Sequence, residues 1–207
     1  MAPKYKLYYF DIKGLAETLR FMLSYMDADW EDVRLPLGSE QWTALKPSMP
    51  FGKLPVLEED GKQIPQSVAT SRYLATKAGL DGKDAWENLQ IDIIADTLQD
   101  VKQPIYAAWR ETDAEKKKSG TETYIKETLP FYFKKLDETV KENGGYLANK
   151  KLSWVDFLFV TITDFLNFTT GLPDVTADYP NLHKLKQSIL NLPKIQQWVA
   201  KRPKTDF

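Results

Sequence analysis

The chain contains no cysteine and only one histidine, His183. Disulfide bridges, a protein thiolate nucleophile and cysteine-ligated zinc are therefore excluded. A single imidazole cannot build a multi-histidine metal site, so we expect no metal.

An excess of charge of one sign is also missing, because 28 Lys and Arg residues face 29 Asp and Glu residues. Such a balance gives no general field for nucleic acid or anionic lipid. No run approaches the ~18 apolar residues of a membrane span, and MAPKYKLYYF lacks the apolar centre of a signal peptide. We expect a cytoplasmic protein with neither nucleic acid nor membrane as a partner.

What is present is ordinary for a globular protein: 207 residues, 43% hydrophobic and 28% charged. This length suits one large domain or two small ones. Aromatic and apolar residues alternate in KYKLYYF, which predicts a first strand. The first 79 residues predict a small α/β domain, with strands at 4–10, 30–35, 54–58 and 62–65 and helices at 15–26 and 67–78.

Residues 79–84, GLDGKD, have two glycines and no apolar period, and we place a linker there. Apolar stripes with helical spacing follow. They predict a helical domain over 85–207, with helices along 91–105, 125–140, 153–168, 181–191 and 194–201.

Pro55 lies where a strand should begin, although proline removes a donor from a sheet. A cis Leu54–Pro55 bond would turn the backbone of Leu54 outward to pair with an extended peptide, whereas trans is the common isomer. Gln66 and Ser67 then begin a helix whose first amides favour a carboxylate. The alternative is that Ser67 only caps its own helix.

Two further groups of charged residues each allow a functional and a structural interpretation. Lys46 and Lys53, with Trp42, could hold a ligand or be solvated loop residues. The acidic stripe of Asp92, Asp96 and Asp100 is either a solvated helix face or a site for an ammonium group.

Taken together, KLYYF with GLAETLRF, then WTALKPSMPFGKLPVLEEDGKQIPQSVATSRYL, DIIADTLQD, LSWVDF and WVAKRPKTDF are similar to cytosolic glutathione transferases. The resemblance runs the whole length and is strongest to the sigma class of insects and other invertebrates. It implies a thioredoxin-like first domain, a helical second domain and a homodimer. It also implies a cis Pro55, and glutathione as co-substrate with no permanently bound cofactor.

The resemblance also assigns roles to residues. Tyr9 is similar to the catalytic tyrosine that holds the glutathione sulfur; its neighbour Tyr8 points to the opposite face of the strand. Around glutathione the implied contacts are Trp42, Lys46 and Lys53 at the glycine end, Leu54 and Pro55 at the cysteinyl part, Gln66 and Ser67 at the γ-glutamyl carboxylate, and Asp100 of the partner subunit at the ammonium group. We expect the second-substrate wall to comprise Phe10, Gly14, Leu15, Tyr106 and Phe207.

The implied activity is conjugation of glutathione to hydrophobic electrophiles such as lipid peroxidation products, with peroxidase activity on organic hydroperoxides as a side reaction. Two alternatives stay open: an isomerase like the prostaglandin D synthases of this class, and a non-catalytic, crystallin-like member of the fold. Leu15 and Gln99 replace an arginine and an aspartate of those synthases, which weighs against the isomerase.

Ser153 and Asp156 resemble a catalytic pair, but their spacing is that of a capping box. We interpret them as structural.

Overall fold

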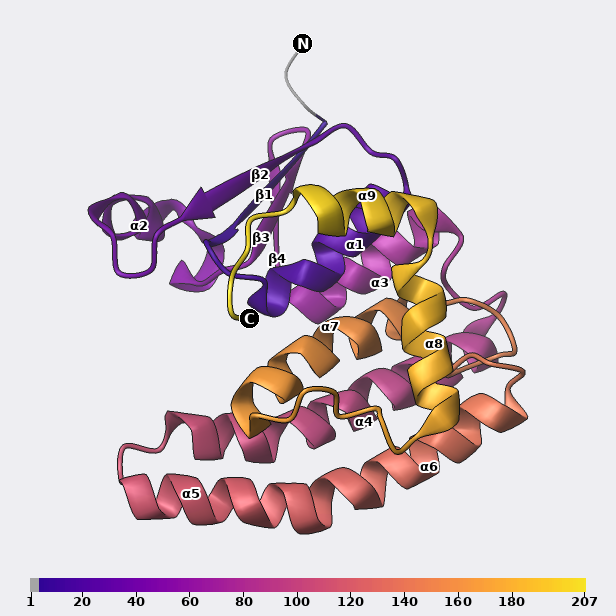
Figure 1. The fold of residues 1–207 in the computed structure, drawn as a ribbon. Helices are drawn as coiled ribbons and strands as arrows, with labels where there is room; N and C mark the ends of the chain where they lie inside the picture. Colours follow the sequence, from indigo (N-terminus) through magenta and orange to yellow (C-terminus); the bar gives the residue numbers. More distant parts are fainter. Residues whose placement is uncertain (1–3) are drawn as a thin grey trace. The chain divides into compact units, whose positions relative to one another are not determined.

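The computed structural model describes residues 4–207, which form two compact units (Figure 1). The first unit comprises the described part of Met1–Gly79 together with Leu192–Phe207, and the second comprises Leu80–Asn191. Residues 192–207 were predicted to belong to the helical domain, but they pack with the first unit.

A four-stranded mixed sheet forms the centre of the first unit, in the order β2-β1-β3-β4. Strand β1 runs parallel to β2 and antiparallel to β3, and β3 and β4 form a hairpin. The strands span Tyr5–Phe10 (β1), Trp30–Leu35 (β2), Val56–Glu59 (β3) and Lys62–Pro65 (β4). The four predicted strands and the two predicted helices occur in the expected order, with helix α2 (Glu40–Leu45) as an addition between β2 and β3. The thioredoxin-like character of the unit is confirmed.

Helix α1 (Glu17–Tyr25) packs against α3 (Ser67–Ala78) and against the C-terminal helix α9 (Pro193–Lys201) (Figure 1). A buried stripe on α1, which includes Leu19, Met22 and Leu23, explains this packing. Short segments complete the unit: the 3-10 turns Gly14–Ala16 (η1), Lys46–Ser48 (η2) and Pro50–Gly52 (η3), and helix α2 (Glu40–Leu45).

The second unit is entirely helical in its described residues. Helix α4 packs against α7, and α8 packs against both α6 and α7. The helices span Ala85–Arg110 (α4), Ala114–Thr123 (α5), Leu129–Glu142 (α6), Trp154–Thr170 (α7) and Pro180–Leu190 (α8), and a π-helical turn, Tyr124–Thr128 (η4), joins α5 to α6. The stripe at 125–140 therefore belongs to two segments rather than one regular helix.

Helix α7 is buried almost all round, as its apolar sequence predicts. Its first turn is fixed by a capping box: the Asp156 carboxylate accepts hydrogen bonds from the Ser153 amide (2.8 Å) and the Leu147 amide (2.9 Å). Burial raises the pKa of Asp156 to about 6, although these hydrogen bonds act in the opposite direction. The structural interpretation of this pair is supported.

We expect Asp156→Ala to lower the free energy of unfolding by about 2–4 kcal/mol, because two buried amides would lose their acceptor. Urea unfolding measures this loss. The glutathione dissociation constant of the folded fraction should not change. Unaltered stability together with lost glutathione affinity would assign Asp156 to the binding site instead.

Candidate active site

Tyr9 lies at the end of β1, on the buried face of the strand. The alternation along β1 buries Tyr5, Leu7 and Tyr9, and only 6% of Tyr9 is exposed. Tyr8 lies on the other face, where its hydroxyl donates to Glu58 at 3.4 Å. Burial and the Glu58 carboxylate raise the pKa of Tyr8. The two neighbouring tyrosines therefore have different environments, and only Tyr9 faces η1.

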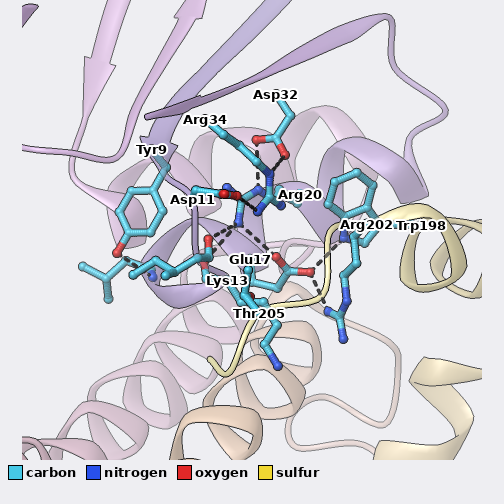
Figure 2. A network of polar contacts seen from close by, with 12 residues as sticks. Tyr9, Asp11, Lys13, Glu17, Arg20, Asp32, Arg34, Trp198, Arg202 and Thr205 are labelled. Carbon is cyan, nitrogen blue, oxygen red and sulfur yellow. Dashed lines mark hydrogen bonds and ion pairs between the residues drawn. The ribbon is translucent and has the colours of Figure 1, made fainter. Parts of the chain in front are cut away.

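The hydroxyl of Tyr9 contacts the backbone at the start of η1. The Leu15 amide donates a hydrogen bond to the phenolic oxygen at 3.1 Å (Figure 2). A phenol both accepts and donates. A phenol is thus a group of the kind that can donate to a sulfur atom.

Gly14 makes this close approach possible. Its φ is +44°, in the left-handed region, and a Cβ built there would lie 2.7 Å from the Tyr9 hydroxyl oxygen. Any side chain at position 14 must therefore displace the tyrosine. The sequence placed Gly14 on the second-substrate wall, whereas the structure shows a contact with Tyr9.

We expect Gly14→Ala to lower glutathione conjugation about 10- to 100-fold, because a shift of the Tyr9 hydroxyl of about 1 Å misplaces the sulfur partner. Gly38→Ala is the matched control: Gly38 has φ +73°, and a Cβ at this position would have nothing within 4 Å. Both variants carry the backbone strain of about 1 kcal/mol, but only Gly14→Ala carries the clash. Equal activity of the two variants in steady-state assays would show that the contact does not matter.

A buried polar network holds the loop between β1 and α1 (Figure 2). Arg20, which is fully buried, donates through Nη1 to the carbonyl oxygens of Ile12 (2.8 Å) and Lys13 (3.1 Å). Its Nε donates to Asp32 at 3.0 Å, and Nη1 also contacts Glu17 at 3.1 Å. The guanidinium carbon lies 5.9 Å from the centre of the Tyr9 ring. Arg20 thus fixes the residues that precede Gly14.

Glu17 connects this network to the C-terminal segment (Figure 2). Its Oε1 accepts from Trp198 Nε1 at 2.8 Å and from Arg202 at 2.6 Å. Burial acts to raise the pKa of Glu17, but Arg20, Arg202 and the Trp198 hydrogen bond together hold it below its usual value. These residues were not among those predicted from the sequence. The signal was present, since Glu17 and Arg20 interrupt an otherwise apolar helix face at spacing i, i+3.

The register of the sheet gathers other predicted residues at the Tyr9 end. Tyr8 pairs with Val56, and Val56 pairs with Pro65. The next positions along these strands, Tyr9, Pro55 and Gln66, therefore lie at one edge. The Leu54–Pro55 peptide is cis, as the resemblance implies.

Helix α3 begins at this edge. Gln66 occupies its N-cap with φ 74°, and within the described chain its side chain makes no capping hydrogen bond. Ser67 is the first helical residue, so the alternative that Ser67 caps the helix is wrong. The first amides of a helix have no partner within it and favour an anion.

The predicted glycine-end residues follow on short helical segments. Trp42, on α2, packs edge-on against Phe10 with ring centres 5.5 Å apart. Lys46 and Lys53 are exposed, and the Lys46 side chain passes close to Gly52. These residues present two cations and an aromatic ring near the end of β1.

The remaining predicted residues lie in other places. Leu15 is 41% exposed, and the Phe207 carbonyl accepts from the Lys13 amide at 2.8 Å. In the helical unit, Asp100 is exposed on α4, and Tyr106 packs its ring 6.1 Å from that of Phe165.

A cavity of about 280 Å³ in the helical unit contains none of the predicted site residues; it lies between α4, α6 and the loop that follows α6. Among residues 4–207 there is no cluster of three His, Asp or Glu side chains that could hold a metal ion. None of the described helices is long and apolar enough to cross a bilayer.

Comparison with known proteins matches both halves of the chain. A family model described as "Glutathione S-transferase, N-terminal domain" covers residues 5–76, and one described as "Glutathione S-transferase, C-terminal domain" covers residues 99–202. The chain is similar to a glutathione S-transferase of Anopheles gambiae, with 45% identity over 99% of both chains.

Prostaglandin D synthases are also similar. The hematopoietic enzyme of Mus musculus is 36% identical over 98% of both chains. The solved structure of prostaglandin synthase D from Nilaparvata lugens is 47% identical, covers 98% of this chain and 100% of its own, and superposes with a TM-score of 0.92.

Proposed function

Because the chain belongs to the glutathione S-transferase family, whose co-substrate is glutathione, we propose that Tyr9 holds the glutathione sulfur as a thiolate for attack on hydrophobic electrophiles. The observation that carries this proposal is the geometry of Tyr9. Its hydroxyl is buried, accepts from the Leu15 amide, and lies beside Gly14 at the start of η1.

The free energy needed to ionise the glutathione thiol at neutral pH is within reach of one hydrogen bond. A thiol of pKa about 8.5 is only a few per cent ionised at neutral pH, and lowering that pKa by two units needs about 2.7 kcal/mol. A charge-assisted hydrogen bond supplies roughly 1.5–3 kcal/mol. The thiol proton passes to solvent, and the sulfur lone pair then forms the S–C bond. An aryl halide loses halide with its electron pair, whereas an activated alkene takes up a proton on the neighbouring carbon.

The edge of the sheet provides the groups that glutathione requires. The outward backbone of Leu54, before the cis Pro55, pairs with the cysteinyl part of the tripeptide. The γ-glutamyl carboxylate lies against Gln66 and Ser67 at the start of α3, where helix amides favour an anion. Trp42, Lys46 and Lys53 hold the glycine carboxylate.

The ammonium group of glutathione requires an acid, which we assign to Asp100 of the partner subunit in a homodimer. The support comes from α4, where Trp86, Ile93 and Asp100 repeat every seven residues and so share one face. Trp86 is 67% exposed and Ile93 48%. Large apolar side chains exposed on one face indicate an interaction surface, and Asp100 would lie at that surface.

Hydrophobic electrophiles need an apolar wall beside the sulfur. We assign Phe10, Leu15, Tyr106 and Phe207 to this wall. We also assign Gly14 to this wall. Its lack of a side chain leaves the space that the Tyr9 hydroxyl occupies.

Retention on immobilised glutathione, followed by an aryl halide conjugation assay, tests the proposal. We expect both retention and turnover. Retention without turnover would support the non-catalytic, crystallin-like alternative, and failure of both would reject the glutathione site.

The finer assignments belong to the same proposal: a sigma-class enzyme of the cytoplasm, with peroxidase activity on organic hydroperoxides. The similarity to prostaglandin D synthases favours an isomerase as the second candidate. Leu15 stands against that candidate, because it provides no second cation beside the thiolate.

A further inference from the structure

Lys102 on α4 is a half-buried cation that forms no ion pair with any acidic side chain of residues 4–207. Its ammonium nitrogen lies over the ring of Phe165 on α7, 5.4 Å from the ring centre. Among the described residues 4–207, Lys102 makes no hydrogen bond or ion pair. Both elements belong to the helical unit, so this contact is internal to one packed body.

The surroundings of Lys102 are aromatic. Tyr106 lies one turn further along α4, and its ring is 6.1 Å from that of Phe165. Trp109 extends the cluster, with its ring 6.0 Å from Phe165 and 6.3 Å from Phe168. Tyr106 is the residue that we assign to the second-substrate wall, so the ammonium lies beside that wall.

This position is costly for an ammonium group. Burial lowers the pKa of Lys102 to about 8, because desolvation disfavours the charged form. Contact with an aromatic face recovers only part of the solvation that the ammonium has lost. A perturbed cation next to a proposed binding surface is typical of a functional position.

We propose that Lys102 binds the carboxylate of amphipathic electrophiles whose apolar chains pack against Tyr106. This inference rests on the proposed function, because it places Lys102 in the second-substrate site. It narrows the hydrophobic electrophiles to long-chain molecules with a carboxylate. A carboxylate would supply the missing counter-charge, and the aromatic cluster would take the chain.

A pair of non-reactive ligands tests the inference without any conjugation chemistry. Decanoate and decanol have chains of equal length and differ in the carboxylate. Binding of each to the glutathione-saturated protein is measured by calorimetry for the wild type, Lys102→Gln and Lys102→Arg. We expect Lys102→Gln to weaken decanoate binding about tenfold and to leave decanol unchanged, since losing one charged hydrogen bond has about that effect. Lys102→Arg should retain decanoate within about threefold, because it keeps the charge.

Lys135 provides the matched control. Its ammonium also lies over a phenylalanine ring, that of Phe131 at 4.6 Å, but both side chains are exposed. Lys135→Gln should change neither ligand. Equal loss of decanoate and decanol in Lys102→Gln, no loss of either, or the same loss in Lys135→Gln would overturn the inference.

Failure here can be told apart from failure of the proposed function. Wild-type turnover of a neutral aryl halide reports on the thiolate mechanism alone. If the wild type turns over the aryl halide but decanoate binds equally well to the wild type and to Lys102→Gln, only the carboxylate site is rejected.

Discussion

Tyr9→Phe should slow aryl halide conjugation at pH 7 by roughly 30- to 100-fold. Without the phenolic proton the sulfur returns to the ordinary thiol pKa of about 8.5, and the thiolate fraction falls about thirty-fold. Loss of sulfur positioning adds the remainder. The dissociation constant of glutathione should change little, because the backbone and charged contacts at the sheet edge remain. Steady-state kinetics and calorimetry measure the two effects separately.

The pH dependence distinguishes ionisation from general damage. Above pH 8.5 a free thiol is itself mostly ionised, so the deficit of Tyr9→Phe should shrink as the pH rises to 9. Tyr8→Phe is the matched control, since Tyr8 lies next in the chain but bonds to Glu58 on the other face. A deficit independent of pH, or an equal deficit in Tyr8→Phe, would place the thiolate partner elsewhere.

Arg20→Leu should lower the free energy of unfolding by roughly 3–5 kcal/mol, because removing one partner of a buried charge pair leaves the other uncompensated. Arg20 and Glu17 are both buried, and the substitution also frees the carbonyls of Ile12 and Lys13. Urea unfolding of the wild type and the variant gives this difference.

Lys194→Ala is the control for this effect. Lys194 pairs with Asp27 at 2.7 Å, but the two side chains are 41% and 74% exposed. Surface pairs contribute about 0–1 kcal/mol, so the control should remain close to the wild type. A loss below about 1 kcal/mol in Arg20→Leu would show that the network does not support the loop.

The Glu17 carboxylate gives the same network a pH dependence. The folded pKa lies below the unfolded value, so its stabilising contribution is present above the unfolded pKa of about 4.3 and is lost as the pH falls through the folded pKa. We expect Glu17→Gln to be less stable than the wild type at neutral pH. The difference should narrow as the pH falls below about 4, which urea titrations at several pH values measure.

Local patterns in the sequence predicted most of the fold. The strand at 30–35 and the helix at 67–78 have the predicted bounds, and Gly79, which ends the helix, is a turn residue visible in the sequence. Helix α2 was missed, since six residues carry too little apolar period to indicate a helix. The π turn Tyr124–Thr128 was missed because the apolar stripe continues across it.

The candidate site divides in the same way. Tyr9, Pro55 and Ser67 were predicted as site residues with the help of the family resemblance, but their position at one edge of the sheet depends on strand register, which local patterns do not give. Arg20 and Lys102 were missed. Their importance comes from burial and from partners distant in the chain, or from the lack of such partners.

Spectroscopic titration of the thiol of bound glutathione, by its thiolate absorbance, tests the central claim most directly. The account predicts a pKa about two units below 8.5 in the wild type and a return toward 8.5 in Tyr9→Phe. An unshifted thiol in the wild type, or an equally low pKa in Tyr9→Phe, would contradict the claim that Tyr9 keeps the sulfur anionic.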